Sequence, residues 1–272
     1  MAEQDIIIAT GKEPITIDIM VRDFKALGLK NGMVMIMHSS LSKIGWVVGG
    51  AQAVVEALLN VVGPDGTIVV PTFTGANSEP SEWEHPPVPE SWWQTIRDNM
   101  PGFDPNITPT RKMGAIVECI RTLPGAIRTN HPEASFAAIG PKAEEILNGQ
   151  PQEYPLGDES PLRKIYDLGG SVLLLGVNHD RNTSLHLAEY RATWPSKKVK
   201  FRGCAIKDED KSRWIEFEDF ETMEEDFNKV GAAFENETDS VTYGTIGLAP
   251  CKFFPQRALV DHAIKWMGKN RE

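Results

Sequence analysis

Two short apolar runs flank an amphipathic segment within residues 33–72, and this order limits the folds open to the chain. The runs 33–37 and 67–71 are predicted to be buried strands. Between them, Gly49 and Gly50 precede apolar side chains at helical spacing, and a Gly-Pro-Asp-Gly turn ends that segment. A strand–helix–strand unit of this length indicates parallel neighbouring strands. We therefore expect an α/β fold with a central mixed, partly parallel sheet flanked by helices.

Residues 75–109 differ in composition from the rest of the chain. They contain seven of the 19 prolines and the tryptophans Trp83, Trp92 and Trp93. We expect a long ordered excursion here, which is either a functional lid or binding loop or a surface loop tethered by its tryptophans. Because no linker or repeat divides the 272 residues, we expect residues 1–272 to form a single domain that carries this excursion.

The chain is acidic, with a formal net charge of −10. This charge argues against nucleic acid or an anionic membrane as the main partner and weakly favours a cationic small molecule. The sequence has no apolar run of transmembrane length, and its acidic N-terminal residues do not resemble a signal peptide. The three cysteines lack zinc or disulfide spacing. We therefore expect a cytoplasmic protein without a metal, either a monomer or a homodimer.

His186 is the strongest candidate for a catalytic side chain. Residues 171–175 indicate a buried strand, a polar loop follows, and Thr183 fits the N-cap of a helix. His186 then falls in the first turn, where the free N–H groups and the positive end of the helix disfavour imidazolium. A histidine kept neutral near pH 7 can accept a proton, so this position suits a general base. The same pattern also fits a surface or packing histidine.

Polar residues follow two other predicted strands. His38, Ser39 and Ser40 come directly after an apolar run, at the end of a strand where the ligands of α/β sheets usually bind. Their hydroxyl and backbone N–H groups could hold phosphate oxygens, although the segment is neither a P-loop nor a dinucleotide fingerprint. His131, before Pro132, follows another short strand, and the polar groups around it could line a cleft.

A carboxylate beside His186 would fix its tautomer and stabilise the imidazolium as it forms. Four candidates lie at and after a predicted strand: Glu216, Glu218, Asp219 and Glu221. Glu189, one turn after His186 on the same predicted helix, competes for this role. The residues alone leave the choice open.

Taken together, these segments resemble the aminoglycoside 3-N-acetyltransferase family. The resemblance covers most of residues 16–267, and its two most specific blocks are the His-Ser-Ser-Leu and Asn-Thr-Ser-Leu-His-Leu-Ala-Glu segments. The matching blocks are 38–41, 63–67 running to 71–73, 110–114, 124–128 into 131–132, 135–138, 174–177, 182–189 and the acidic run near Asp219.

The resemblance implies acetyl transfer from acetyl-CoA to the 3-amino group of the 2-deoxystreptamine ring, on an α/β fold distinct from that of the GNAT acetyltransferases. The family's catalytic histidine matches His186, and its acidic partners align with the stretch that contains Asp219 and Glu221. The coenzyme-binding loop matches the segment of His38, Ser39, Ser40 and Leu41, with Thr72, Phe73, Arg111, Ser135 and Phe136 expected beside the coenzyme.

A polycationic aminoglycoside would be held by acidic and aromatic side chains. The candidates are Glu79, Trp83, Asp158, Glu159 and Asp180. Backbone N–H groups of residues 39–41 are candidates for stabilising the thioester oxyanion. The resemblance also leaves room for a small non-antibiotic amine as the acceptor.

Three other functions remain open at this point. One is a serine hydrolase that uses Ser39 or Ser40 with His186, although no G-x-S-x-G elbow is present. Another is a metal hydrolase with His179, Asp180 and His186 as ligands, although no HExxH pattern is present. The third is a coenzyme-binding module without catalytic activity.

Overall fold

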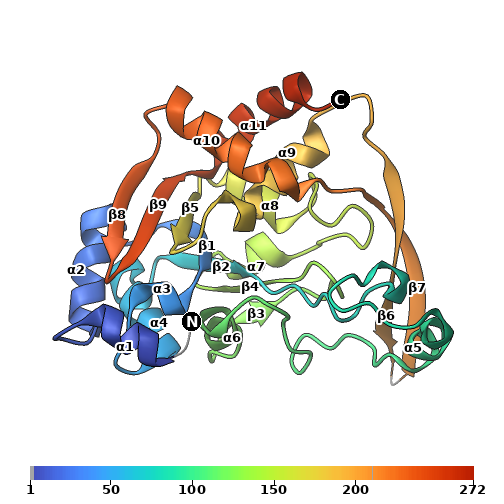
Figure 1. Cartoon of the computed structure of the whole chain (residues 1–272), viewed down its shortest axis with the longest axis horizontal. Coiled ribbons are helices and arrows are strands. Elements are labelled where there is room, and N and C mark those ends of the chain that lie inside the picture. Colours follow the sequence, from blue (N-terminus) through green and yellow to red (C-terminus); the bar gives the residue numbers. More distant parts are fainter. Residues whose placement is uncertain (1–2, 210) are drawn as a thin grey trace.

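The computed structural model describes residues 3–209 and 211–272, and its centre is a mixed sheet (Figure 1). Seven strands of the described residues form this sheet in the order β3-β4-β2-β1-β5-β9-β8. Strands β2, β1 and β5 are parallel neighbours, and all other pairs are antiparallel. The strands are β1 (Val34–Ser39), β2 (Thr67–Pro71), β3 (Ile127–Arg128), β4 (Phe136–Ile139), β5 (Ser171–Leu175), β8 (Thr242–Ile246) and β9 (Ala249–Pro255).

Helices cover both faces of this sheet (Figure 1). One face packs on α2 (Ile17–Leu27), α3 (Leu41–Ile44), α4 (Gly50–Val62) and α6 (Ala115–Arg121). The other face packs on α7 (Ala143–Leu147), α8 (Pro161–Asp167), α9 (Ser184–Arg191), α10 (Phe227–Glu237) and α11 (Gln256–Asn270). The additional helix α1 (Glu3–Thr10) buries no residue. The predicted α/β class and the mixed, partly parallel sheet flanked by helices are confirmed.

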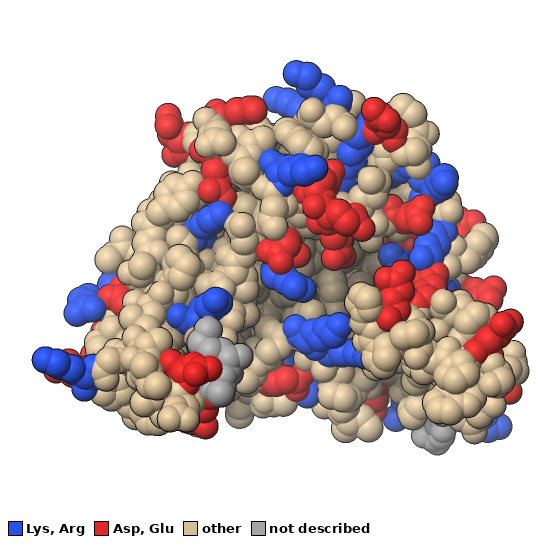
Figure 2. All heavy atoms as spheres, viewed as in Figure 1, with Lys and Arg blue, Asp and Glu red and all other residues tan. Residues whose placement is uncertain are grey.

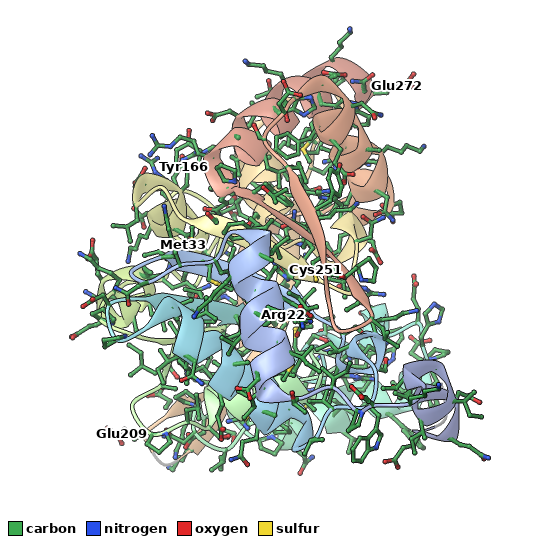
Figure 3. All side chains as sticks on the ribbon, turned by 90° about the vertical axis from the view of Figure 1, so that its left-hand side faces the viewer. Arg22, Met33, Tyr166, Glu209, Cys251 and Glu272 are labelled. Carbon is green, nitrogen blue, oxygen red and sulfur yellow. The ribbon has the colours of Figure 1, made fainter. Side chains whose placement is uncertain are left out.

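Side-chain alternation along β1 separates the two cores. Met35 and Met37 belong to the core beneath α4, whereas Ile36 belongs to the core beneath α9. Successive strand residues point to opposite faces, so His38 continues the row of Ile36 toward the α9 side. Helix α2 shows the complementary pattern: it buries Phe24, and its Arg22 lies on the outer face (Figure 3).

A two-stranded arm projects beside the main sheet and consists of β6 (Val199–Asp208) and β7 (Lys211–Phe220) (Figure 1). The proline-rich excursion packs on this arm and contains η1 (Pro80–Glu82), η2 (Glu90–Trp92) and α5 (Trp93–Asn99). Asn77 exchanges two hydrogen bonds of 2.8 Å with the backbone of Ala205, and the Phe103 N–H donates to the same residue's carbonyl. The excursion is therefore an ordered segment tethered to the arm.

Among residues 3–209 and 211–272, no helix is both long enough and apolar enough to cross a bilayer.

Candidate active site

The carboxyl ends of β2, β1 and β5 meet at one edge of the sheet. After β1 the chain runs to α4 on one face, and after β5 it runs to α9 on the opposite face. The two connections therefore diverge between β1 and β5. In open α/β sheets, ligands bind in the crevice at such a switch point.

A cavity of about 500 Å³ opens at this edge. The surface of the molecule is hollowed near the middle of the face drawn in Figure 2, with basic and acidic side chains around the hollow. The cavity is lined by Met37, His38, Ser39, Ser40, Pro71, Phe73, Gly75, Arg111, Lys112, Met113, Val117, Val177, Arg181 and Thr183. The structure thus brings together His38, Ser39, Ser40, Phe73 and Arg111 from the predicted coenzyme site.

The other four predicted coenzyme residues do not line this cavity. Thr72 and Ser135 are fully buried, their hydroxyls lie 2.9 Å apart, and the Nε of Arg128 lies 3.1 Å from each of them. Phe136 belongs to the core on the α9 side, and Leu41 begins α3 and packs on the opposite core. These residues support the strand ends from within the protein.

His186 lies in the first turn of α9, as predicted, and is 5% exposed. Thr183 is the N-cap residue of α9, as predicted, but its side chain makes no cap bond. Asn182 Oδ1 instead accepts from the Ser184 N–H at 3.2 Å. The ring of His186 meets the edge of Phe227 on α10, with 5.1 Å between ring centroids.

Each ring nitrogen of His186 meets a carboxylate. Nδ1 lies 2.7 Å from Glu189 Oε2 on the same helix, and Nε2 lies 3.4 Å from Glu224 Oε1. Glu224 begins η4 (Glu224–Asp226), in the connection from β7 to α10. Glu189, named from the sequence as a competitor for His186, is thus in contact with the ring, whereas Glu224 was missed because it belongs to a distant charged run without a distinctive pattern.

Asp219 and Glu221 have other contacts, so the expectation that they pair with His186 is wrong. Asp219 is buried at the base of the arm, where it accepts from the Tyr190 hydroxyl and pairs with Arg202 Nε at 2.9 Å. Glu221 is exposed, and its N–H donates to the carbonyl of Lys198. The acidic stretch that follows β7 reaches His186 three residues later, through Glu224.

The protonation state of His186 also differs from the expectation. Burial favours the neutral ring, but hydrogen bonds to Glu189 and Glu224 outweigh it and raise the pKa of His186 to about 9. Imidazolium is therefore the dominant form at neutral pH when no other molecule is bound. The position at the helix N-terminus predicted a neutral ring. Two carboxylates in contact with the ring, however, stabilise the imidazolium more than the helix dipole destabilises it.

His38 has the opposite character. Burial first, and then the charges of His186 and His179, lower the pKa of His38 to about 3. Its Nε2 is buried without a hydrogen-bond partner among residues 3–209 and 211–272. A neutral imidazole at the wall of the cavity therefore lies within the electrostatic reach of the imidazolium of His186.

A second cavity, of about 370 Å³, shares Gly75, Arg111 and Lys112 with the first. Trp83 lines it and donates from Nε1 to Ser78 Oγ at 2.9 Å. Its remaining walls are Ser78, Glu82, Glu84, His85, Pro86, Glu133 and Arg202. Burial raises the pKa of Glu133 to about 8, although Arg202 lies 3.7 Å away. Glu79 is not part of this wall, because its carboxylate holds Arg97 at 2.5 Å.

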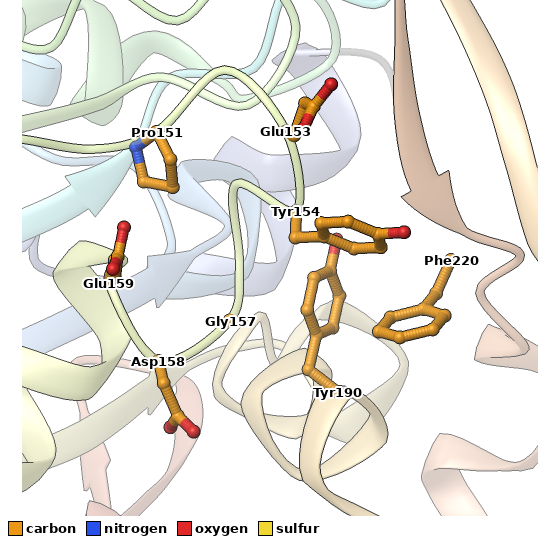
Figure 4. Close-up of a pocket in the computed structure, with 8 residues that line it drawn as sticks. All are labelled: Pro151, Glu153, Tyr154, Gly157, Asp158, Glu159, Tyr190 and Phe220. Carbon is orange, nitrogen blue, oxygen red and sulfur yellow. The ribbon is translucent and has the colours of Figure 1, made fainter.

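Asp158 and Glu159 line a third cavity, of about 400 Å³, which Tyr154, Tyr190 and Phe220 close with their rings (Figure 4). Asp158 also pairs with Arg191 Nε at 2.7 Å. Asp180 contacts a different set of residues. Its carboxylate pairs with Arg181 at 3.2 Å, and its N–H donates to Asn228. The predicted acceptor residues are therefore distributed over several surfaces.

A serine hydrolase would need a bond between His186 and a serine hydroxyl, and a metal hydrolase would need grouped metal ligands. The Ser40 hydroxyl lies 3.3 Å from that of Ser42, and no bond between His186 and a serine hydroxyl occurs among the described residues. His179 is held by Glu235, with 2.8 Å between Nε2 and Oε1. In the part of the chain that the structure describes, no three or more His, Cys, Asp or Glu side chains are grouped as metal ligands.

A buried histidine held by two carboxylates lies one helical turn from a residue that lines a cavity at the switch point of a doubly covered sheet, and such an arrangement can exchange a proton with a small molecule. Comparisons with known proteins specify the family. Residues 36–268 match the model of the family described as aminoglycoside 3-N-acetyltransferase. The chain belongs to this family and is an acetyltransferase.

Two curated relatives span most of the chain. The SPbeta prophage-derived aminoglycoside N(3')-acetyltransferase-like protein YokD of Bacillus subtilis is 48% identical over 258 residues, covering 94% of each chain. Aminoglycoside N(3)-acetyltransferase VIII of Streptomyces fradiae is 37% identical over 227 residues, covering 82% of this chain and 77% of its own.

Solved structures agree in fold. The crystal structure of YokD superposes with a TM-score of 0.94 at 47% identity and covers 98% of both chains. The structure of AAC-IIIb with CoASH has a TM-score of 0.85 at 30% identity, covering 94% of this chain and 97% of its own. AAC-VIa bound to sisomicin has a TM-score of 0.83 at 27% identity, covering 94% and 98%.

Proposed function

We propose that this protein transfers the acetyl group of acetyl-CoA to the 3-amino group of the 2-deoxystreptamine ring of an aminoglycoside, directly and with His186 as the general base. The observation that carries the proposal is the contact of His186 with both Glu189 and Glu224, one helical turn from Thr183, which lines the cavity of the strand ends. The related AAC-IIIb was solved with CoASH and AAC-VIa with sisomicin, which supports these two classes of substrate.

The cavity at the ends of β1 and β2 suits the coenzyme. Arg111 and Lys112 provide positive charge for phosphate groups, and Ser39 and Ser40 provide hydroxyls. Phe73 provides apolar surface for the less polar part of the molecule. Since Thr183 at the start of α9 lines the same cavity, His186 lies one turn from the space in which we expect the thioester.

His186 accepts the proton that the acceptor amine must lose. The amine nitrogen forms a bond to the thioester carbon as the carbon–sulfur bond breaks, and the proton passes from nitrogen to Nε2 of His186. The coenzyme leaves as a thiolate that then takes up a proton. Glu189 on Nδ1 fixes the ring and stabilises the imidazolium that the step forms.

The raised pKa of His186 fits a cationic acceptor. Glu224 is the more exposed of the two carboxylates, at 60% of its side chain, and holds Nε2 at only 3.4 Å. An incoming ammonium group competes with His186 for Glu224, and each contact that Glu224 transfers to the acceptor lowers the pKa of His186. Acceptor binding therefore helps to generate the neutral ring that catalysis requires.

The thioester oxyanion needs hydrogen-bond donors, and residues 39–41 remain our candidates. The Ser40 N–H is already donated to the Leu175 carbonyl at 2.9 Å, so it is not available for this role. The Leu41 N–H, at the first position of α3, has no intrahelical acceptor and is the better choice.

Acidic side chains near the cavity would hold the remaining ammonium groups of the acceptor. Glu82, Glu84 and Glu133, together with Trp83, line the cavity that shares a wall with the coenzyme cavity. Glu82 pairs with Lys200 Nζ at 2.8 Å and Glu133 lies 3.7 Å from Arg202 Nη1, whereas no cation pairs with Glu84 among the described residues. We therefore favour Glu84 over Glu79 and Asp158, whose carboxylates already hold arginines.

The decisive experiment measures free thiol released from acetyl-CoA with a panel of amines. The panel contains aminoglycosides with and without a free 3-amino group on the 2-deoxystreptamine ring, and small non-antibiotic amines. We expect release only with the free 3-amino group, and a product acetylated at that nitrogen by NMR. Equal release without any amine would instead identify a thioester hydrolase, and release with small amines alone would identify a different acceptor.

A further inference from the structure

Arg271 directly follows α11 and is nearly inaccessible, since only 2% of its side chain is exposed. It is not among the residues that line the cavities described above. Its guanidinium lies over the ring of Trp194, 4.8 Å from the centroid, which fixes the plane of the group. An arginine buried this deeply requires several partners, because an unpaired buried charge is very costly.

The partners of Arg271 are the carboxylates and backbone around His186. Its Nη1 donates to Glu189 Oε1 at 2.8 Å. Its Nε and Nη2 donate to the two oxygens of Asp226, at 2.8 and 2.6 Å, and Nη2 also donates to the Met223 carbonyl at 2.8 Å. One guanidinium therefore joins α9 to the turn that carries Glu224.

These bonds give the two carboxylate oxygens of Glu189 different partners. Oε1 accepts from Arg271 and from the Met223 N–H, both at 2.8 Å. Oε2 is left to accept from His186 Nδ1 at 2.7 Å. A carboxylate fixed at one oxygen cannot rotate, so its other oxygen has a fixed direction toward the imidazole.

The second carboxylate depends on the same arginine. Met223 and Asp226 stand on either side of Glu224, the residue that meets His186 Nε2. Arg271 holds both flanking positions. Loss of its guanidinium would release the turn and, with it, the position of Glu224.

We propose that Arg271 is a positioning residue for the acetyl transfer, which sets the orientation of Glu189 and Glu224 on the two nitrogens of His186. This inference rests on the proposed function for its effect on turnover, but its effect on the His186 ring does not depend on any reaction. It predicts that Arg271 matters for the catalytic rate and not for the coenzyme cavity.

The charges around His186 determine how the pKa of its ring responds to a substitution at Arg271. Glu189 and Glu224 favour the imidazolium, whereas Arg271, through their shared partner Glu189, opposes it as a like charge. The other groups that face this set are His38 from β1, Arg181 from η3 (His179–Arg181), Lys197 from the segment after α9, and Asp226 from η4. Removing the guanidinium charge alone would raise the pKa of His186, whereas releasing Glu189 and Glu224 from the ring would lower it, because these two contacts are what raise it.

The test compares Arg271→Met, Arg271→Lys and the control Lys269→Met, an exposed residue of α11. We expect Arg271→Met to lower kcat about 10- to 100-fold, because small misplacements of catalytic groups have effects of this size. The KM for acetyl-CoA should change less than about 3-fold. Arg271→Lys keeps the charge without the fork of donors, so it isolates the positioning effect: it should lower kcat and move the rising limb of the pH profile to lower pH.

A second measurement separates positioning from plain stability. NMR titration of the His186 ring, without substrates, should show a lower pKa in Arg271→Lys and no change in Lys269→Met. In Arg271→Met the pKa should be higher than in Arg271→Lys, because the like charge is also gone. Unchanged kcat in a folded Arg271→Met protein, together with an unchanged ring pKa in Arg271→Lys, would overturn the proposal. If Arg271→Met does not fold, the titration and kinetics of Arg271→Lys decide. A wild type without acetyl transfer would defeat the proposed function, but the ring titration would still test Arg271.

Discussion

His38 and His186 hold opposite protonation states at neutral pH. The pKa of His38 is lowered to about 3 by burial and by the charge of His186, and the pKa of His186 is raised to about 9 by hydrogen bonds that outweigh its burial. His38 lies at the end of β1 and His186 at the start of α9, so a neutral and a charged imidazole lie at the same edge of the sheet. In the proposed mechanism, the active form of the enzyme therefore loses a proton from His186 and not from His38.

This difference predicts the pH dependence of catalysis. A general base acts only when neutral, so kcat/KM should increase with pH and level off only above about 9, the pKa of His186 in the free protein. Initial rates of thiol release between pH 6 and 10, at acetyl-CoA and acceptor concentrations below KM, measure this profile. A plateau that begins near pH 6.5 would contradict the pairing of His186 with Glu189 and Glu224.

Glu224→Gln should move this profile to lower pH. The substitution removes one of the two charges that favour imidazolium, so the pKa of His186 should decrease and the rising limb should shift with it. Glu225→Gln is the matched control, since Glu225 is the adjacent exposed acid of η4. An identical profile in both variants would mean that Glu224 does not contact the ring in solution.

The strand ends of the site could be predicted from the sequence, because they follow from local patterns. The apolar runs around the helix of residues 50–62 gave the parallel pair β1 and β2, and the end of β1 located His38. The loop after β5 located His186 in the first turn of α9. Period-two alternation and a polar loop before a helix are properties of adjacent residues, so they need no knowledge of the tertiary fold.

The electrostatics of the site could not be predicted in this way. Glu224 reaches His186 only because the chain that follows β7 returns to α9, where Met223 and Glu224 contact Glu189 and His186, and Asp219 is instead held by Tyr190 and Arg202. The helix end alone suggested a neutral His186, since a local rule does not include carboxylates from elsewhere in the chain. The burial of Thr72 and Ser135 could not be predicted either, because their pairing with Arg128 depends on the register of β2 and β4.

Arg111→Gln should weaken coenzyme binding more than catalysis. Arg111 lines the cavity at the strand ends and supplies positive charge there, but it does not touch His186 or its carboxylates in the described contacts. We expect the KM for acetyl-CoA to rise about 10-fold, the scale of one lost charge-assisted contact, with kcat changed less than about 3-fold. Lys30→Gln, at an exposed residue away from the cavity, controls for net charge. An unchanged KM would remove Arg111 from the coenzyme site.

His131 should make the folded protein sensitive to acid. Its Nδ1 accepts from the N–H groups of Glu133 and Ala134, at 3.2 and 2.9 Å, and its Nε2 donates to the Gln152 carbonyl at 3.0 Å. Protonation of Nδ1 would break both accepted bonds. Burial, helped by the charge of Arg202 and opposed by the bond to Gln152, lowers the pKa of His131 from 6.5 to about 4.

The sign of the effect follows from that lowered pKa. The unfolded chain takes up the proton near pH 6.5, whereas the folded protein resists until about pH 4, so the contribution of His131 to stability is complete above 6.5 and is lost as the pH falls toward 4. Between pH 7.5 and 5 this amounts to about 2 kcal/mol. Urea unfolding at both pH values should show the loss in the wild type and about 2 kcal/mol less of it in His131→Gln, which lacks the titrating ring. Equal losses in the two proteins would show that His131 titrates normally in the folded state.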